Sequence, residues 1–313
     1  MHLGVGTGLL KAARRARQIG ATALQIFSDN PTAWRRRPEP PREAPRFVEY
    51  ATGAGIAPIA IHASYLINLA ATAEPFATQS RAALIHELQR APAYGARYVN
   101  THIGSHRGAG RATGIATVAA NIEAILDETP PDAILVLENS AGGGDTVGAT
   151  LEELAAIVGA VSRSHDRLAF CLDTAHLWGV GYDVASAEGA TGVIDRFAEL
   201  IGLERLALVH LNDSSSHQGS RSDRHQHLGA GRIGPQGLAA LLRDPRLRGA
   251  TFIMETPGED EGYDAVNMRR ARLLHAGETE LPQLPPRAFK LNRRSSRAAR
   301  PRDNGPAGVT PRG

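Results

Sequence analysis

The sequence predicts an α/β fold, a TIM (β/α)8 barrel whose first strand is truncated at the N-terminus. Short apolar segments alternate with amphipathic helical segments, which is the pattern of a parallel α/β protein. About 275 of the 313 residues follow this pattern, and eight units of that total length are usual for the barrel. Residues able to bind a metal end six consecutive strands, where the active sites of such barrels lie.

Seven strands are recognisable as short apolar runs, and helical periodicity fills the intervals between them. We expect strands at residues 22–27, 58–61, 97–101, 133–138, 167–172, 206–211 and 250–255, and helices at residues 75–94, 115–127, 150–161 and 235–242. An eighth strand should precede Thr7, but the chain starts at Met1, His2 and Leu3, so most of it is missing. Either the start is misassigned or the barrel is imperfectly closed.

The chain divides into a barrel domain, residues 1–280, and a tail, residues 281–313. The tail is rich in Pro, Arg, Gly and Ser and has no helical or strand period, so we expect disorder. Residues 286–313 hold eight Lys and Arg against one Asp, which leaves the remaining chain with a net charge of −4. A solvated extension is the favoured interpretation of the tail, and a non-specific nucleic-acid arm is the alternative.

Composition limits the kinds of site and location. Cys171 is the single cysteine, so an intramolecular disulfide and a cysteine-rich zinc site are both excluded. No run of eighteen apolar residues predicts a membrane span. The basic residues of the N-terminal segment follow its apolar stretch, the reverse of a secretory signal. We therefore expect a cytoplasmic protein in which His, Asp and Glu hold any metal.

Metal-binding residue types end or directly follow the last six predicted strands. In chain order they are His62, His102, Glu138, Asp173 with His176, His210 and Glu255. One such residue alone is more often an ordinary polar side chain, but the barrel brings all six strand ends to one mouth. Packing so many imidazoles and carboxylates together without cations would be costly. The pattern therefore predicts a cluster of metal ions.

A polar loop adds two further candidates, Asp223 and His225. Their spacing places both side chains on one side of an extended segment, where they could form a second site with His176. A mobile polar loop is the simpler interpretation of this segment alone. Nitrogen and oxygen ligands suit zinc or manganese, and closely spaced divalent ions catalyse in-line attack on phosphate. The ligand types therefore favour phosphoester hydrolysis.

Longer motifs resemble those of the endonuclease IV family, the zinc-dependent apurinic/apyrimidinic endonucleases. They are IHASYLINLA (61–70), THIGSH (101–106), LENSAGGG (137–144), CLDTAHLWGVGYD (171–183), HLNDSSSHQGSRSDRHQHLGAGRIG (210–234) and METP (254–257). Their length and order make the resemblance specific, and it extends from about residue 2 to residue 275. It implies a xylose-isomerase-like barrel and a monomeric DNA-repair hydrolase that cuts double-stranded DNA at abasic sites.

The resemblance also implies three zinc ions, with manganese as an alternative at one of the sites. By analogy the first ion is held by His62, His102 and Glu138, the second by Asp173, His210 and Glu255 with Glu138 bridging, and the third by His176, Asp223 and His225. Glu138 and Glu255 would be the catalytic carboxylates. The enzyme would hydrolyse the phosphodiester bond 5′ to the abasic site, leaving a 3′-hydroxyl and a 5′-deoxyribose phosphate.

Four residues match DNA-contacting positions of the family, which bends the duplex and flips out the abasic nucleotide. Tyr65 and Leu66 match the inserting side chains, and Asn30 and Trp34 match a second DNA-contacting loop. Ordinary loop packing is the alternative role for Tyr65 and Leu66.

Two other functions remain open. A metal-dependent sugar isomerase or epimerase of the xylose-isomerase-like group could use Glu138, Asp173, His210 and Glu255. The other five candidate ligands would then have no function, so metal analysis separates this enzyme from a nuclease. A DNA-binding protein that has lost catalysis through its shortened N-terminus is the second alternative, and a nicking assay tests it.

Overall fold

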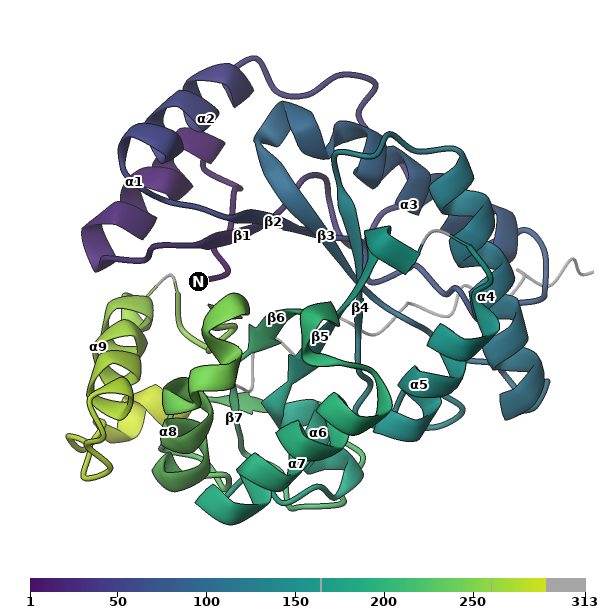
Figure 1. The fold of residues 1–313 in the computed structure, drawn as a ribbon. Coiled ribbons are helices and arrows are strands. Elements are labelled where there is room, and N and C mark those ends of the chain that lie inside the picture. Colours follow the sequence, from purple (N-terminus) through teal and green to yellow (C-terminus); the bar gives the residue numbers. More distant parts are fainter. Residues whose placement is uncertain (164, 260, 291–313) are drawn as a thin grey trace, which may run out of the picture.

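A computed structural model of the chain describes residues 1–163, 165–259 and 261–290. Its central sheet has seven parallel strands in the order β1-β2-β3-β4-β5-β6-β9, surrounded by helices (Figure 1). The strands are β1 Leu24–Phe27, β2 Ile59–His62, β3 Ala96–His102, β4 Ile134–Glu138, β5 Leu168–Asp173, β6 Leu206–His210 and β9 Thr251–Ile253. All seven predicted strands are therefore confirmed, with their ends shifted by two residues or fewer.

The helices follow the strands in alternation. They are α1 Leu9–Ile19, α2 Ala44–Gly53, α3 Phe76–Arg90, α4 Arg111–Asp127, α5 Leu151–Ala160, α6 Thr174–Val180, α7 Ala187–Leu200, α8 Pro235–Arg243 and α9 Tyr263–His275. The four predicted helices correspond to α3, α4, α5 and α8. A short hairpin of β7 (Asp213–Ser214) and β8 (His225–Gln226) lies after β6. Among the described residues, no helix combines the length and apolar character needed to cross a membrane.

Three N-terminal residues close the sheet. The backbone N–H of Gln25 donates to the carbonyl of Met1, and that of Leu3 donates to the carbonyl of Gln25, both at 3.0 Å. On the other side, the N–H of His2 donates to the carbonyl of Met254, just after β9, at 2.9 Å. The first strand is thus reduced to a single bridging residue. His2 joins β1 to the segment after β9, and this closes the barrel.

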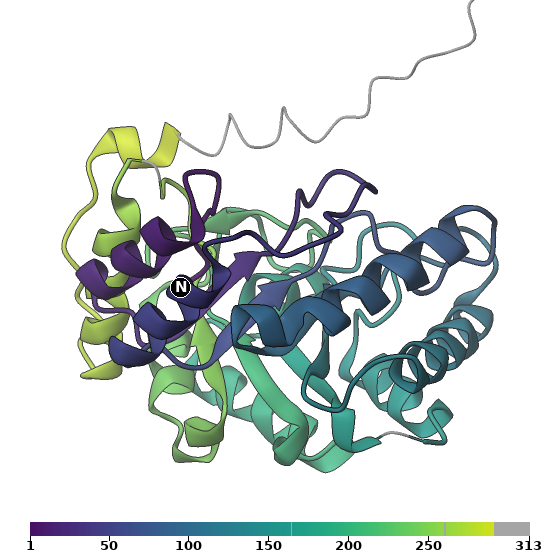
Figure 2. The same ribbon diagram turned by 90° about the horizontal axis from the view of Figure 1, so that it is seen from above.

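The first and last helices complete the ring outside this junction. Figure 2 shows α1, in purple, beside α9, in yellow-green. Arg15 of α1 donates from Nε to Asp264 Oδ2 of α9 at 2.6 Å, and the Asp264 side chain is fully buried. Such a charge-assisted contact between two ends of the chain holds the barrel closed where its strand is shortest.

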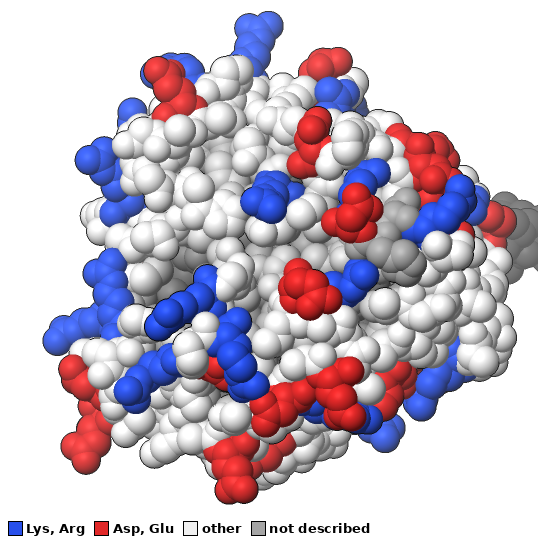
Figure 3. Space-filling model, in the orientation of Figure 1, with Lys and Arg blue, Asp and Glu red and all other residues white. Residues whose placement is uncertain are grey.

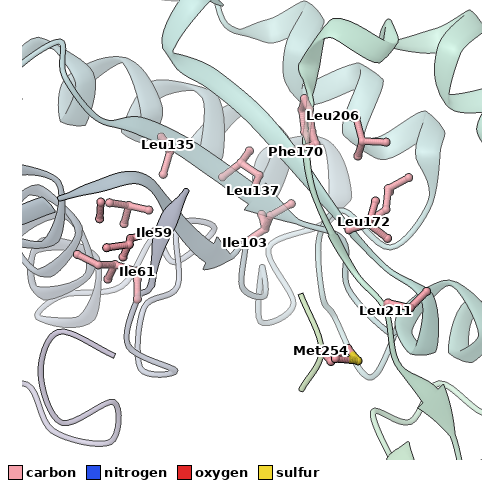
Figure 4. Packing of buried hydrophobic residues seen from close by; sticks show 14 of the residues in the cluster. Ile59, Ile61, Ile103, Leu135, Leu137, Phe170, Leu172, Leu206, Leu211 and Met254 are labelled. Carbon is pink, nitrogen blue, oxygen red and sulfur yellow. The ribbon is translucent and has the colours of Figure 1, made fainter. Parts of the chain in front are cut away.

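Side chains alternate between two layers along each strand. Outward-facing residues pack beneath the helices, among them Ile59, Ile61, Leu135, Leu137, Phe170 and Leu172 (Figure 4). Inward-facing residues, joined by Ala207 where the register of β5 and β6 is irregular, form a small apolar plug of Ala60, Val136, Ala169, Cys171 and Leu208. Above the plug, the last inward positions of the strands hold polar residues. The barrel interior is therefore apolar below and polar at its mouth.

Residues 281–290 pack on the barrel, which corrects the prediction that the tail is disordered from residue 281. Ala288, in η5 (Pro286–Lys290), is buried, and its carbonyl accepts a hydrogen bond from His227 Nε2 at 3.2 Å. Arg270 of α9 donates from Nη1 to the carbonyl of Pro282 at 2.6 Å. The prediction for residues 291–313 lies outside the described residues.

Candidate metal centre

The strand ends bring imidazoles and carboxylates to one mouth of the barrel, as the sequence predicts. Five of these residues end successive strands from β2 to β6: His62, His102, Glu138, Asp173 and His210. Glu255 follows β9 by two residues. A cleft of about 870 Å³ opens at this mouth, and seven of the nine predicted ligands line it: His62, His102, Glu138, His176, Asp223, His225 and Glu255.

One oxygen of Glu138 faces the first pair of imidazoles. Glu138 Oε2 lies 3.5 Å from His62 Nε2 and 3.9 Å from His102 Nε2. His62 lies with Nδ1 2.8 Å from the carbonyl of Ala63, which can only accept a hydrogen bond. Nδ1 therefore donates to that carbonyl, which leaves Nε2, the nitrogen that faces Glu138, as the nitrogen available to a metal ion. These are the three residues predicted for the first ion.

The other oxygen of Glu138 faces a second group. His210 Nδ1 lies 3.4 Å from Glu138 Oε1, 3.3 Å from Glu255 Oε2 and 3.9 Å from Asp173 Oδ2. The four side chains come from β4, β5, β6 and the segment after β9. Because its two oxygens point into different groups, Glu138 has the geometry of a carboxylate that bridges two ions.

A third group forms where the β7–β8 hairpin approaches α6. Asp223 Oδ2 lies 3.4 Å from His176 Nε2, and Asp223 Oδ1 lies 3.0 Å from His225 Nε2. Both imidazoles have Nδ1 against backbone carbonyls, at 2.8 and 3.0 Å, which directs Nε2 inward. His225 Nε2 is also 3.4 Å from Asp173 Oδ2. Asp173 therefore adjoins the third group as well as the second, to which the prediction had assigned it.

The start of α6 sets the spacing between Asp173 and His176. Asp173 Oδ1 accepts hydrogen bonds from the backbone N–H groups of Ala175 and His176, at 2.7 and 3.0 Å, and so caps the helix. Its Oδ2 stays directed at the ligand groups. A capped first helical turn thus places two ligands three residues apart in the sequence.

Two buried atoms test whether the site fits metal ions. Within the described part of the chain, Glu138 Oε1 and His210 Nδ1 are buried and have no hydrogen-bond partner, an arrangement that is costly unless another group satisfies them. Their separation of 3.4 Å is long for a hydrogen bond. It suits two ligands of one zinc ion, because bonds of about 2.0–2.1 Å in tetrahedral geometry place neighbouring ligand atoms roughly 3.3 Å apart. The residues therefore fit divalent cations.

The imidazoles and carboxylates stabilise one another's charges. Burial lowers the pKa of His176, but Asp173 and Asp223 outweigh it and raise that pKa to about 10. Burial likewise raises the pKa of Glu138, but His210 and His102 hold it well below its usual range. Protons thus occupy the positions that cations would take, and metal binding would release them.

Two buried asparagines support the ligands, and the sequence reasoning missed both. Asn100 donates from Nδ2 to Glu138 Oε2 at 2.6 Å. Asn212 donates from Nδ2 to Asp173 Oδ2 at 2.7 Å and accepts from the backbone N–H of Glu255 at 2.8 Å. Each lies two residues from a predicted histidine ligand, and that spacing was the one available signal. Such partners orient ligands and tune their basicity.

Comparison with known proteins identifies the family. The family described as xylose isomerase-like TIM barrel matches residues 13–274. Endonuclease 4 of Thermus thermophilus is 41% identical over 275 residues, which cover 87% of this chain and 96% of the relative. The chain belongs to the endonuclease IV family. A crystal structure of endonuclease IV from Thermus thermophilus agrees, with a TM-score of 0.78, 40% identity and coverage of 88% of this chain and 98% of that one.

Endonuclease IV proteins share their barrel with sugar enzymes. D-psicose 3-epimerase from Clostridium cellulolyticum has a TM-score of 0.62 at 12% identity, covering 88% of this chain and 94% of its own. That likeness shows the fold alone. The sequence identity to endonuclease 4 is 41%, against 12% to the epimerase, and it shows the family as well as the fold. Both the predicted family and the predicted fold class are therefore confirmed.

In this endonuclease IV family member, Tyr65 and Leu66 lie on the loop after β2. Tyr65 is 54% exposed and lines the cleft. Its ring centroid is 5.3 Å from that of Phe27 and 5.5 Å from that of His62, in an edge-on and a tilted arrangement. Leu66 beside it is half-buried. An exposed aromatic ring thus lies beside the candidate ligand His62, and its contact with DNA stays a prediction.

The loop after β1 holds Asn30 and Trp34, which are also predicted to contact DNA. Asn30 is exposed, and its Oδ1 accepts from the backbone N–H of Thr32 at 3.0 Å, an Asx turn that shapes the loop. Trp34 is half-buried against the core. The backbone N–H of Tyr65 donates to the carbonyl of Pro31 at 3.1 Å, so the two loops are joined at the mouth.

Charge on the outer surface is mixed. The face drawn in Figure 3 carries basic and acidic side chains interspersed, rather than one continuous basic surface. At the cleft, Arg224 is the only Arg or Lys among the described lining residues, against Glu138, Asp223, Glu255 and Glu259. Carboxylates outnumber Arg224 at the mouth, and bound cations would make the local charge more favourable to a polyanion.

Proposed function

We propose that this endonuclease IV family member hydrolyses the phosphodiester bond on the 5′ side of an abasic site in double-stranded DNA. The products would be a 3′-hydroxyl and a 5′-deoxyribose phosphate, and three zinc ions would serve the reaction. The observation that supports this most strongly is the convergence of nine candidate ligands in three adjoining groups, with Glu138 shared between the first two. Family membership supplies the general activity, cleavage of DNA by a hydrolase.

Each group would hold one ion, through the residues already described. Closely spaced divalent ions lower the pKa of bound water and neutralise charge on a phosphate under in-line attack. The protein's own contribution is to fix the ligands. Backbone carbonyls hold three of the imidazoles, and Asn100 and Asn212 hold Glu138 and Asp173. A site held this firmly needs little reorganisation during the reaction.

Selectivity for an abasic nucleotide would come from the shape of the cleft. Tyr65, on the loop after β2, and Phe27, at the end of β1, present aromatic surface beside His62 on one wall of the cleft. Aromatic side chains at such a position can stack on bases or fill the gap that a flipped nucleotide leaves. A sugar without its base would reach the ligand groups more easily than an intact nucleotide, without any reading of sequence.

A synthetic duplex with a single abasic site tests the proposal. The purified zinc-loaded protein should nick the damaged strand, leave a 3′ end that a DNA polymerase can extend, and lose activity in a strong chelator. Intact duplex should stay uncut. Binding of the abasic duplex without nicking would overturn the proposal in favour of a non-catalytic DNA-binding protein.

Two substitutions test the assigned ligands. Glu138→Ala removes the bridging carboxylate, and His210→Ala removes the nitrogen at the centre of the second group. Nicking should fall by orders of magnitude in both, with the helical circular dichroism retained. His217→Ala is the matched control, because His217 lies on the same loop as Asp223, is exposed and belongs to none of the groups. Near-normal nicking by either ligand variant would contradict the roles assigned to Glu138 and His210.

A further inference from the structure

Gln25 is a polar residue in the middle of β1 that none of the predicted roles includes. It is fully buried and faces the barrel interior, where its strand partner is Ala60 of the apolar plug. Burying an amide is unfavourable unless both of its ends find hydrogen-bond partners. The partners of Gln25 therefore indicate what holds it in this position.

The amide connects two candidate ligands that come from different strands. Gln25 Nε2 lies 2.8 Å from Glu255 Oε1, and Gln25 Oε1 lies 3.1 Å from His210 Nε2. The carboxylate decides the orientation of the amide, because a carbonyl oxygen turned toward Glu255 would face another acceptor. Gln25 Oε1 thus accepts from His210, and the proton of that imidazole is fixed on Nε2.

This contact leaves the other ring nitrogen of His210 directed at the ligand groups. His210 Nδ1 is the buried atom without a hydrogen bond, 3.4 Å from Glu138 Oε1 and 3.3 Å from Glu255 Oε2. In the second group, then, the side-chain carbonyl of Gln25 does what backbone carbonyls do for His62, His176 and His225.

The same amide also fixes the orientation of the Glu255 carboxylate, whose two oxygens contact different groups. Oε1 is held by Gln25 Nε2 and by His2 Nδ1, each at 2.8 Å. Oε2 is left to face His210 Nδ1. Gln25 therefore orients both His210 Nδ1 and Glu255 Oε2 toward the second group.

We propose that Gln25 is a positioning residue of the second metal site: it holds His210 in the Nε2–H tautomer and turns Glu255 Oε2 inward. The inference rests on the proposed function, since it presumes a cation in that group. Gln25 does not contact the reacting atoms. Its removal should loosen the cation, because losing a partner behind a metal ligand typically weakens metal affinity about 10- to 100-fold.

Gln25→Met and Gln25→Ala test the proposal in the full-length zinc-loaded protein, and Ile26→Val is the matched control. Met keeps the size of the side chain without its hydrogen bonds, and Ala guards against a misfit of Met. Ile26 is the next residue of β1, also fully buried, but it faces the helices. Zinc affinity is measured by competition with a chromophoric chelator, and the cobalt-substituted protein reports ligand geometry through its absorption spectrum.

The Gln25 variants should bind their weakest-held zinc about 10- to 100-fold less tightly than wild type and show an altered cobalt spectrum. The Ile26→Val variant should match wild type in both measurements. A folded Gln25 variant with wild-type zinc affinity and cobalt spectrum would overturn the positioning role. Wild-type protein that holds zinc but cannot nick abasic DNA would contradict the proposed function only, and wild-type protein that holds no zinc would overturn both.

Discussion

Glu87 should make the stability of this protein fall as pH rises through the neutral range. It lies on α3 beneath the loop after β1 and is 1% exposed. The hydroxyl of Ser28 donates to its Oε2, and Arg36 Nη1 lies 3.9 Å from its Oε1. Burial outweighs both neighbours and raises the pKa of Glu87 from 4.5 to about 7. The folded protein therefore keeps this carboxyl protonated at pH values where the unfolded chain has lost the proton.

The direction and the size of this effect on the free energy of unfolding follow from proton linkage. Below about pH 4.5 the carboxyl is protonated in both the folded and the unfolded state, so its full contribution to the free energy of unfolding is present. Between about pH 4.5 and 7 the folded state binds more protons than the unfolded state, so the free energy of unfolding declines as pH rises. Above about pH 7 it levels off. A shift of this size corresponds to a loss of about 3 kcal/mol in the free energy of unfolding. Glu87→Gln keeps the size and polarity of the side chain but cannot ionise, so it should escape that loss.

Urea unfolding of both proteins at a series of pH values between 4.5 and 8 measures the effect. The difference between variant and wild type matters, because protonation of the candidate metal ligands affects both proteins alike and cancels. The variant should gain about 3 kcal/mol on wild type across this range. A difference independent of pH, or one that shrinks as pH rises, would refute the argument. Nicking should be retained, since Glu87 anchors the loop from below and does not line the cleft.

Three further perturbations have defined outcomes. Gly104→Ala should destabilise the protein by about 3 kcal/mol or more in urea unfolding, because φ is +105° and the new Cβ would lie 2.1 Å from Asn68 Oδ1. Gly159→Ala, in α5 with nothing within 4 Å, should instead be neutral or slightly stabilising. Tyr65→Ala should weaken binding of an abasic duplex about tenfold or more by fluorescence anisotropy, with thermal stability nearly unchanged. Deletion of residues 291–313 should leave zinc content and nicking at low salt intact, since every predicted ligand precedes residue 256; loss of either would show that the tail serves the site.

The strand ends could be predicted because a parallel barrel imposes two regularities at once. Alternation fixes which residues face inward, and parallel pairing puts the inward residues nearest the carboxyl ends at one mouth. His62, His102, Glu138 and His210 each end an apolar run, so their convergence followed from the pattern alone. The position of Asp173 between two groups could not be predicted from the pattern, because it depends on where the β7–β8 hairpin places His225.

The supporting amides could not be predicted, because a single Gln or Asn inside a strand has no periodic signature. Gln25 stands among apolar residues in β1, and the identity of its partners depends on segments more than 180 residues away in the sequence. The packing of residues 281–290 was missed for a similar reason. Its Pro-rich composition predicts disorder, whereas burial of Ala288 and hydrogen bonds from Arg270 and His227 hold it against the barrel.

The choice between a nuclease and a sugar epimerase depends on how the flanking histidines are held. Glu138, Asp173, His210 and Glu255 alone could serve a sugar enzyme, and the barrel is common to both. His62, His176 and His225, however, each have Nδ1 against a carbonyl and Nε2 directed at a carboxylate. A barrel that binds one ion through those four residues would leave these three oriented imidazoles without a metal to bind. The proposed nuclease would give these imidazoles a function, because a phosphodiester accumulates charge on the attacking, the leaving and the non-bridging oxygens together, and adjoining cations could neutralise that charge.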